Sequence, residues 1–83
     1  MTNLRRIRLQ YGIHLTELQR VSGLPNQYIS RAELGLIHPT DTLEEQLYDA
    51  LDEIAAERRS ALYALEKALM LRRHRLLEPS GDA

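Results

Sequence analysis

The chain has 83 residues and a net charge of −1, which predicts one domain with a small core and argues against a general polycation. It contains no Cys, so disulfides and thiolate metal sites are excluded, and we expect a cytoplasmic protein. No apolar run approaches the roughly 18 residues of a membrane span, and Arg5, Arg6 and Arg8 interrupt the apolar stretch that a signal peptide requires.

The charges are arranged in three blocks along the chain. Residues 1–40 hold five Arg and two Glu, which gives a net charge of +3. Residues 41–57 hold seven acidic residues and no base, whereas residues 58–77 hold six bases and one Glu. An arrangement of this kind predicts that the separate blocks meet separate partners.

The first helix is predicted at residues 3–11. Leu4 and Ile7 are spaced for burial, and Tyr11 follows one turn later, while the three Arg of this segment lie mostly off that stripe. Gly12 is expected to end the helix, because Gly adopts the left-handed conformation that follows a last helical turn without steric cost.

A second helix is predicted at residues 15–22, where apolar residues recur at helical spacing. His14 is its expected N-cap, a poor one by composition, and Ile13 before it can pack on Leu18 as a hydrophobic staple. The segment Gly23-Leu24-Pro25 then stops the helix, since Gly23 can supply a positive φ for a tight turn.

The third helix is predicted at residues 26–34, with Ile29 and Ala32 on its buried side and Gly35 at its end. Two short helices joined by a tight turn that contains Gly predict a helix-turn-helix. Glu33 is expected to pair within the domain, with Arg20 as a candidate partner. The residues predicted to point outward from this helix are Asn26, Gln27, Ser30 and Arg31.

Residues 40–78 contain neither Gly nor Pro, and the run Thr42-Leu43-Glu44-Glu45 is a capping box that predicts the start of a helix there. The pattern is compatible with one helix of about 35 residues, as its Ala and Leu content favours, or with a break at Asp52. A 3- or 4-residue spacing predicts a stripe that would be exposed on a helix this long and would need a partner surface. The stripe consists of Ile54, Leu62, Leu65, Leu69, Arg72 and Leu76.

Residues 4–51 resemble the Cro/repressor (XRE) family of helix-turn-helix proteins. The segments with the resemblance are Leu18…Ser22-Gly23-Leu24, Tyr28-Ile29-Ser30-Arg31, and Glu33-x-Gly35 followed by Pro39.

The chain departs from the family pattern at three places. Gln19 stands where a small residue is usual, and His14 stands where Ser or Asn usually opens the helix. Leu36 and Ile37 occupy a loop that is usually basic or polar, which removes phosphate contacts. We expect these two residues either to pack beneath the following helix or to form part of a subunit contact.

The resemblance implies an all-α fold, a four- to five-helix lambda-repressor-like domain with an extended C-terminal helix. The DNA-binding domain is expected at residues 1–53, with Leu47 and Leu51 closing its core. A C-terminal dimerisation helix is expected at residues 54–78, followed by a disordered tail at residues 79–83.

The resemblance implies double-stranded DNA as a partner, because the second helix of such a motif presents its residues to base edges. The expected base-reading residues are Asn26, Gln27, Tyr28, Ser30 and Arg31. The expected phosphate contacts are Arg5, Arg6 and Thr16, although a solvated basic face explains the Arg of the first helix equally well. The expected dimerisation residues are Ile54, Leu62, Leu65 and Leu69.

The sequence therefore favours a sequence-specific transcriptional regulator, a dimeric repressor that reads a pseudo-palindromic operator. The alternative is a protein-binding module of the same fold, similar to an antitoxin or to a partner of a larger regulator. An enzyme is not favoured, and neither a metal nor another cofactor is expected. The three His, at positions 14, 38 and 74, do not have metal-ligand spacing, and no Gly-rich loop is present to bind a phosphate.

The charge blocks predict an antiparallel homodimer through residues 54–76. A parallel pair of the C-terminal helices would set acids against acids, whereas an antiparallel pair sets acids against bases. A fold-back within one chain would match the charges equally well, but residues 56–60 contain no turn residues. A register centred near Arg58 places Leu47 opposite Leu69, Leu51 opposite Leu65, and Ile54 opposite Leu62. This register competes with the domain core for Leu47 and Leu51, so a register shifted toward the C-terminus is the alternative.

Overall fold

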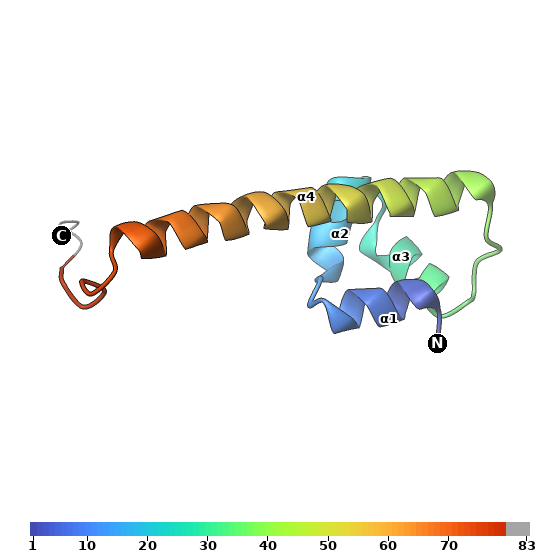
Figure 1. Cartoon of the computed structure of the whole chain (residues 1–83). Coiled ribbons are helices and arrows are strands. Elements are labelled where there is room, and N and C mark those ends of the chain that lie inside the picture. Colours follow the sequence, from blue (N-terminus) through green and yellow to red (C-terminus); the bar gives the residue numbers. More distant parts are fainter. Residues whose placement is uncertain (80–83) are drawn as a thin grey trace.

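The computed structural model describes residues 1–79 and contains four α-helices in that part of the chain. Figure 1 shows three short helices grouped against the first half of a long one, whose second half projects away from the group. The described part measures 54 × 22 × 21 Å along its principal axes. The helices are α1 (Asn3–Gln10), α2 (Leu15–Ser22), α3 (Asn26–Glu33) and α4 (Asp41–Leu71).

The all-α fold with an extended C-terminal helix is confirmed. The long helix runs without a break through Asp52 and ends at Leu71, which is short of the predicted limit at residue 78. Beyond Leu71 the chain turns, His74 adopts a φ of 68°, and the Arg75 guanidinium donates to the Leu71 carbonyl. None of the described helices is long and apolar enough to cross a membrane. The expected disordered tail, except for Pro79, lies outside the described residues.

The N-terminus of α4 differs from the predicted capping box. Thr40 is the N-cap, and its hydroxyl accepts a hydrogen bond of 3.1 Å from the Leu43 amide. The prediction of Thr42 was wrong because Thr40 precedes the helix in extended backbone and the helix begins at Asp41, so Thr42 already lies in the first turn. The other predicted cap is confirmed, since His14 begins α2 without a side-chain hydrogen bond.

The core contains residues of α2, α3, α4 and the α1–α2 turn, whereas α1 contributes only the partly buried Leu4 at its edge. Leu18 of α2, Ile29 of α3 and Ile54 of α4 are fully buried, and Ile13 packs beside them as the staple predicts. The implied core residues Leu47 and Leu51 are only half-buried at its edge, whereas Ala50 and Ile54 are buried.

Ile54 was assigned to dimerisation, and this assignment needs correction. Its side chain is 1% exposed in the core of a single chain, so no surface remains for a second copy to contact. The stripe open to a partner therefore begins about two turns further along α4, at Leu62.

Two ion pairs hold α2 and the α1–α2 turn against α4. Arg20 pairs with Glu57 at 2.9 Å, not with Glu33, and this hydrogen bond raises the pKa of Arg20 above its usual value. Arg58 donates to the carbonyl oxygens of Tyr11 and Gly12 and pairs with Glu17 at 3.1 Å. Arg58 thus fixes the direction in which α4 leaves the domain.

The turn between α2 and α3 requires a residue with a positive φ, and Gly23 has a φ of 77° there. A Cβ at this position would meet no atom within 4 Å, so the cost of a substitution is conformational rather than steric. We expect Gly23→Ala to lower the free energy of unfolding by about 1 kcal/mol, since left-handed backbone costs an L-residue roughly that much.

Urea denaturation at one fixed protein concentration measures this effect. Gly23→Asn is the matched control, because Asn tolerates the left-handed region and should lose less. A Gly23→Ala variant as stable as the parent chain would contradict this account of the turn.

Candidate nucleic-acid interface

Helix α3 is oriented by a buried ion pair at its C-terminal end. The carboxylate of Glu33 accepts two hydrogen bonds from the Arg8 guanidinium of α1, at 2.5 and 3.2 Å. The Glu33 side chain is buried, the Arg8 side chain is 14% exposed, and Arg8 also donates to the Ile13 carbonyl at 3.2 Å. The pair neutralises the Glu33 charge, so it removes a repulsion that a phosphate backbone near α3 would otherwise meet.

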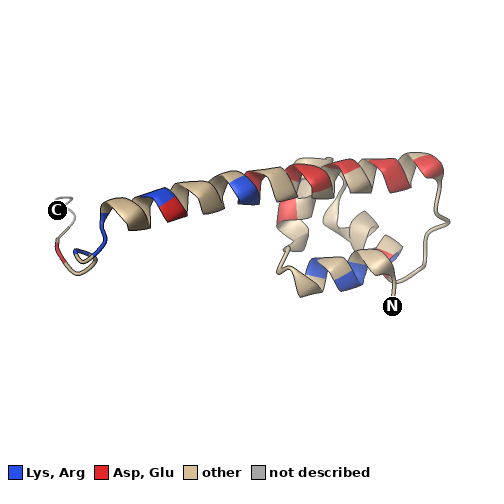
Figure 2. Ribbon diagram, viewed as in Figure 1, with Lys and Arg blue, Asp and Glu red and all other residues tan. Residues whose placement is uncertain are grey.

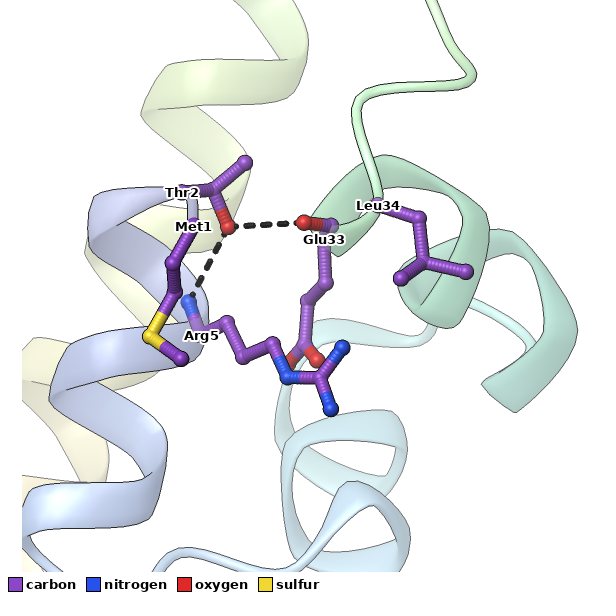
Figure 3. A pocket seen from close by; sticks show the side chains of 5 residues that line it. All are labelled: Met1, Thr2, Arg5, Glu33 and Leu34. Atoms are coloured by element: carbon purple, nitrogen blue, oxygen red, sulfur yellow. Dashed lines mark hydrogen bonds between the residues drawn. The ribbon is translucent and has the colours of Figure 1, made fainter.

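A second contact joins the same two helices at the start of the chain. The Thr2 hydroxyl donates to the Glu33 carbonyl at 2.9 Å and accepts from the Arg5 amide at 3.2 Å (Figure 3). Thr2 is also the N-cap of α1. The basic helix α1 and the end of α3 are therefore joined by hydrogen bonds to both the backbone and the side chain of Glu33.

The predicted base-reading residues divide into two groups in the structure. Gln27, Tyr28 and Arg31 are exposed, and Gln27 and Arg31 lie four residues apart on one face of α3. Asn26 and Ser30 are half-buried beside that face. The Asn26 Oδ1 atom is buried without a hydrogen-bond partner among the described residues, so its amide is only partly available to a ligand.

The predicted phosphate-binding residues also differ in exposure. Arg6 on α1 and Thr16 on α2 are exposed, and neither side chain takes part in a described hydrogen bond. Arg5 is half-buried and lines a shallow pocket of about 480 Å³ with Met1, Thr2, Glu33 and Leu34 (Figure 3). Its Nε atom is buried and has no partner among the described residues.

Charge is segregated on the helical group. Figure 2 shows basic residues on α1 and acidic residues along the first half of α4, on opposite sides of the group, with α3 between them. The bases of the second half of α4 lie on the projecting part of that helix. A polyanion can therefore approach α1 and α3 without meeting the acids of α4.

Sequence reasoning missed two side chains that build this interface. Arg8 was treated as a surface base although it binds the Glu33 carboxylate, and Arg58 was considered only as the centre of a dimer register although it binds three groups of the domain. The only local signal for the first pair is that Glu33 follows the buried Ile29 by four residues, which puts it on the core side of α3. No pattern along the chain identifies its partner.

The model of the helix-turn-helix family matches residues 4–52, which is more than half of the 83 residues and includes α1 to α3 and the first part of α4. The chain therefore belongs to this family and is a helix-turn-helix protein of the Cro/XRE type, a class of DNA-binding regulators. Comparisons with curated proteins and with solved structures gave no significant match.

The structure offers no metal centre within residues 1–79, because no three His, Cys, Asp or Glu side chains there converge on one point.

The Arg8–Glu33 pair gives a test of how α3 is held. We expect Glu33→Leu or Arg8→Met each to lower the free energy of unfolding by about 3 kcal/mol, because each leaves a charge in a buried site without its partner. The double variant should lose much less than the sum of the two, since no isolated charge remains.

Urea denaturation of the four proteins at one concentration measures the coupling. Simple addition of the two losses would show that the side chains do not depend on each other.

Proposed function

We propose that the protein is a dimeric transcriptional repressor that reads a pseudo-palindromic operator with α3 of each copy. The observation that supports this most is the exposed face of α3, where Gln27 and Arg31 point to solvent while the acidic residue of the same helix is neutralised by Arg8. A Gln side chain can bind adenine at N6 and N7, and an Arg side chain can bind guanine at O6 and N7.

Phosphate contacts would set the position of α3 on the duplex. Arg6 and Thr16 are exposed on the two helices that precede α3 in sequence, and the half-buried Arg5 keeps a guanidinium near the same surface. Contacts of this type fix the orientation of a protein on DNA without reading its sequence. Repression then needs only that the protein occupies its operator.

Dimerisation is supported by the projecting half of α4. Leu62, Leu65 and Leu69 are exposed there at helical spacing and are not among the residues that pack against the core of the described chain. An exposed apolar stripe on a projecting helix is typical of a subunit contact. Two copies joined in this way would present two α3 helices, as a pseudo-palindromic operator requires.

The second candidate function is a protein-binding module with the same fold. Leu34 and Leu36 are exposed at the end of α3, and no base follows in the loop that leads to the acidic part of α4. An apolar surface at this place suits a protein better than a phosphate backbone. The two functions differ in one cheap measurement, because a DNA-binding protein retains weak, salt-sensitive affinity for random duplex DNA.

The base-reading role of α3 is tested by substitution. We expect Arg31→Ala to weaken operator binding by about 1–3 kcal/mol while its effect on random duplex DNA is smaller, because a bidentate contact to a base discriminates by that amount. Gln27→Ala should act similarly at another position of the operator. Fluorescence anisotropy with an operator selected from genomic fragments measures both affinities.

The matched control is Arg59→Ala, which removes an exposed Arg from the part of α4 beyond the domain. If Arg31→Ala and Gln27→Ala leave the ratio of operator to random affinity unchanged, these residues do not read bases.

The phosphate role of α1 predicts a change in salt dependence. Arg6→Ala should weaken binding to operator and random DNA alike and lower the slope of log K against log salt by about one unit. Arg5→Ala should behave in the same way. Loss of operator preference with an unchanged slope would instead place these residues at the bases.

A further inference from the structure

An apolar groove opens between α1 and the first half of α4. It has a volume of about 570 Å³ and is closed at one end by the loop that follows α3. Although the groove borders the core, two of its large side chains face solvent, since Ile7 is 40% exposed and Tyr48 is 70% exposed. The apolar residues that line it include Leu4, Ile7, Ile37, Leu47, Tyr48 and Leu51.

The groove wall and the projecting stripe lie on one face of α4. Steps of 4, 7, 4, 3 and 4 residues along the helix return to the same side, as a rotation of about 100° per residue requires. The residues related by these steps are Leu47, Leu51, Arg58, Leu62, Leu65 and Leu69. The first two line the groove, and the last three are the exposed stripe.

This geometry lets one copy complete the other. If two α4 helices lie antiparallel with this face between them, the projecting half of each extends over the groove of its partner. Leu65 then falls near Leu51, and Leu69 near Leu47, in a register centred on Arg58. From Arg58 to Leu71 the helix is about 20 Å long, which is sufficient to reach both groove residues.

Charge favours the same occupant. The part of α4 that forms the groove wall, residues 41–53, holds six acids and no base, and residues 58–77 hold six bases and one acid. A second copy therefore brings bases to acids at both ends of an antiparallel pair, and complementary charge of this kind selects orientation.

Arg58 near the two-fold axis is compatible with this pairing. Its guanidinium binds the Tyr11 and Gly12 carbonyls and the Glu17 carboxylate of its own chain, which directs and compensates its charge. The repulsion between the two copies of Arg58 is thereby reduced.

We propose that the α1–α4 groove is the binding site for the projecting half of α4 from a second copy. Each copy then fills the open groove of its partner. The proposal rests on the dimer of the proposed function but not on the reading of DNA. The exposed Ile7, Tyr48 and Leu65 side chains all become buried in the pair, and the groove stays open in a single chain.

Sedimentation equilibrium of single variants tests both surfaces of the proposed contact, the groove and the exposed stripe of α4. Leu65→Asp on the stripe and Ile7→Asp on the groove should each raise the dissociation constant of the dimer by about 100-fold, because each places a charge in an apolar contact. Tyr63→Asp is the matched control, since Tyr63 is 69% exposed on the opposite face of α4, and its dimer should be unchanged. Circular dichroism checks that every variant is folded.

If Ile7→Asp is not folded, Tyr48→Arg replaces it, because this exposed side chain lies on the same wall and would face the basic half of the partner. If Ile7→Asp or Tyr48→Arg dimerises as tightly as the parent chain while Leu65→Asp is monomeric, the groove is not the binding site. The dimer through the α4 stripe would still be supported. A monomeric parent chain would contradict both the dimer and the groove contact. Its affinity for random duplex DNA would still test the DNA-binding function independently.

The absence of Cys allows a direct measurement of the register. In Leu51→Cys/Leu65→Cys the two thiols of one straight helix are about 21 Å apart, so they cannot join within a chain. Mild oxidation should therefore give a covalent dimer, whereas Leu51→Cys/Tyr63→Cys should not. Equal yields of covalent dimer from the two variants would contradict the proposed face.

Discussion

The arrangement of the proposed DNA-binding surface depends on the ion pair between Arg8 and Glu33. A carboxylate buried in so small a core is unfavourable unless a cation and further donors compensate it, and Arg8 supplies two hydrogen bonds. The pair fixes the end of α3 against α1, and the Thr2 hydroxyl adds a bond to the backbone at the same place. The exposed Arg6 of α1 and the exposed Arg31 of α3 are thus positioned by one buried contact between their helices.

The long helix α4 has a different role in each half. Its first half completes the core with Ala50 and Ile54, and Arg58 ties it to the α1–α2 turn. Its second half leaves the domain with an exposed apolar stripe. A domain this small buries a modest fraction of its surface, so a partner that covers both the stripe and the open groove would add to its stability. DNA binding and assembly would then depend on the same helix.

The sequence predicted the three short helices within one or two residues, because Gly12, Gly23 and Gly35 mark their ends by a local requirement for a positive φ. Local patterns failed where a neighbouring or distant residue decides. The capping box at Thr42 was overridden by the extended backbone at Thr40, and α4 ends at Leu71 although neither Gly nor Pro stops it there.

The candidate site was predicted less completely than the helices. The exposed positions of Gln27 and Arg31 follow from helical periodicity, which is a local property. The partners of Glu33 and of Arg58 lie 25 and more than 40 residues away, so no spacing rule identifies them. The burial of Ile54 likewise depends on how α4 crosses α2, which the spacing of apolar residues along α4 alone does not determine.

The proposed regulatory function requires that α1 and α3 form a surface for duplex DNA. The affinity of the full chain for random duplex DNA, measured by fluorescence anisotropy over a range of salt concentrations, tests it most directly. A surface of this kind should bind random duplex DNA weakly at low salt, with log K falling linearly as log salt rises. An absence of affinity at the lowest salt, with the chain folded, would contradict the claim and favour the protein-binding alternative.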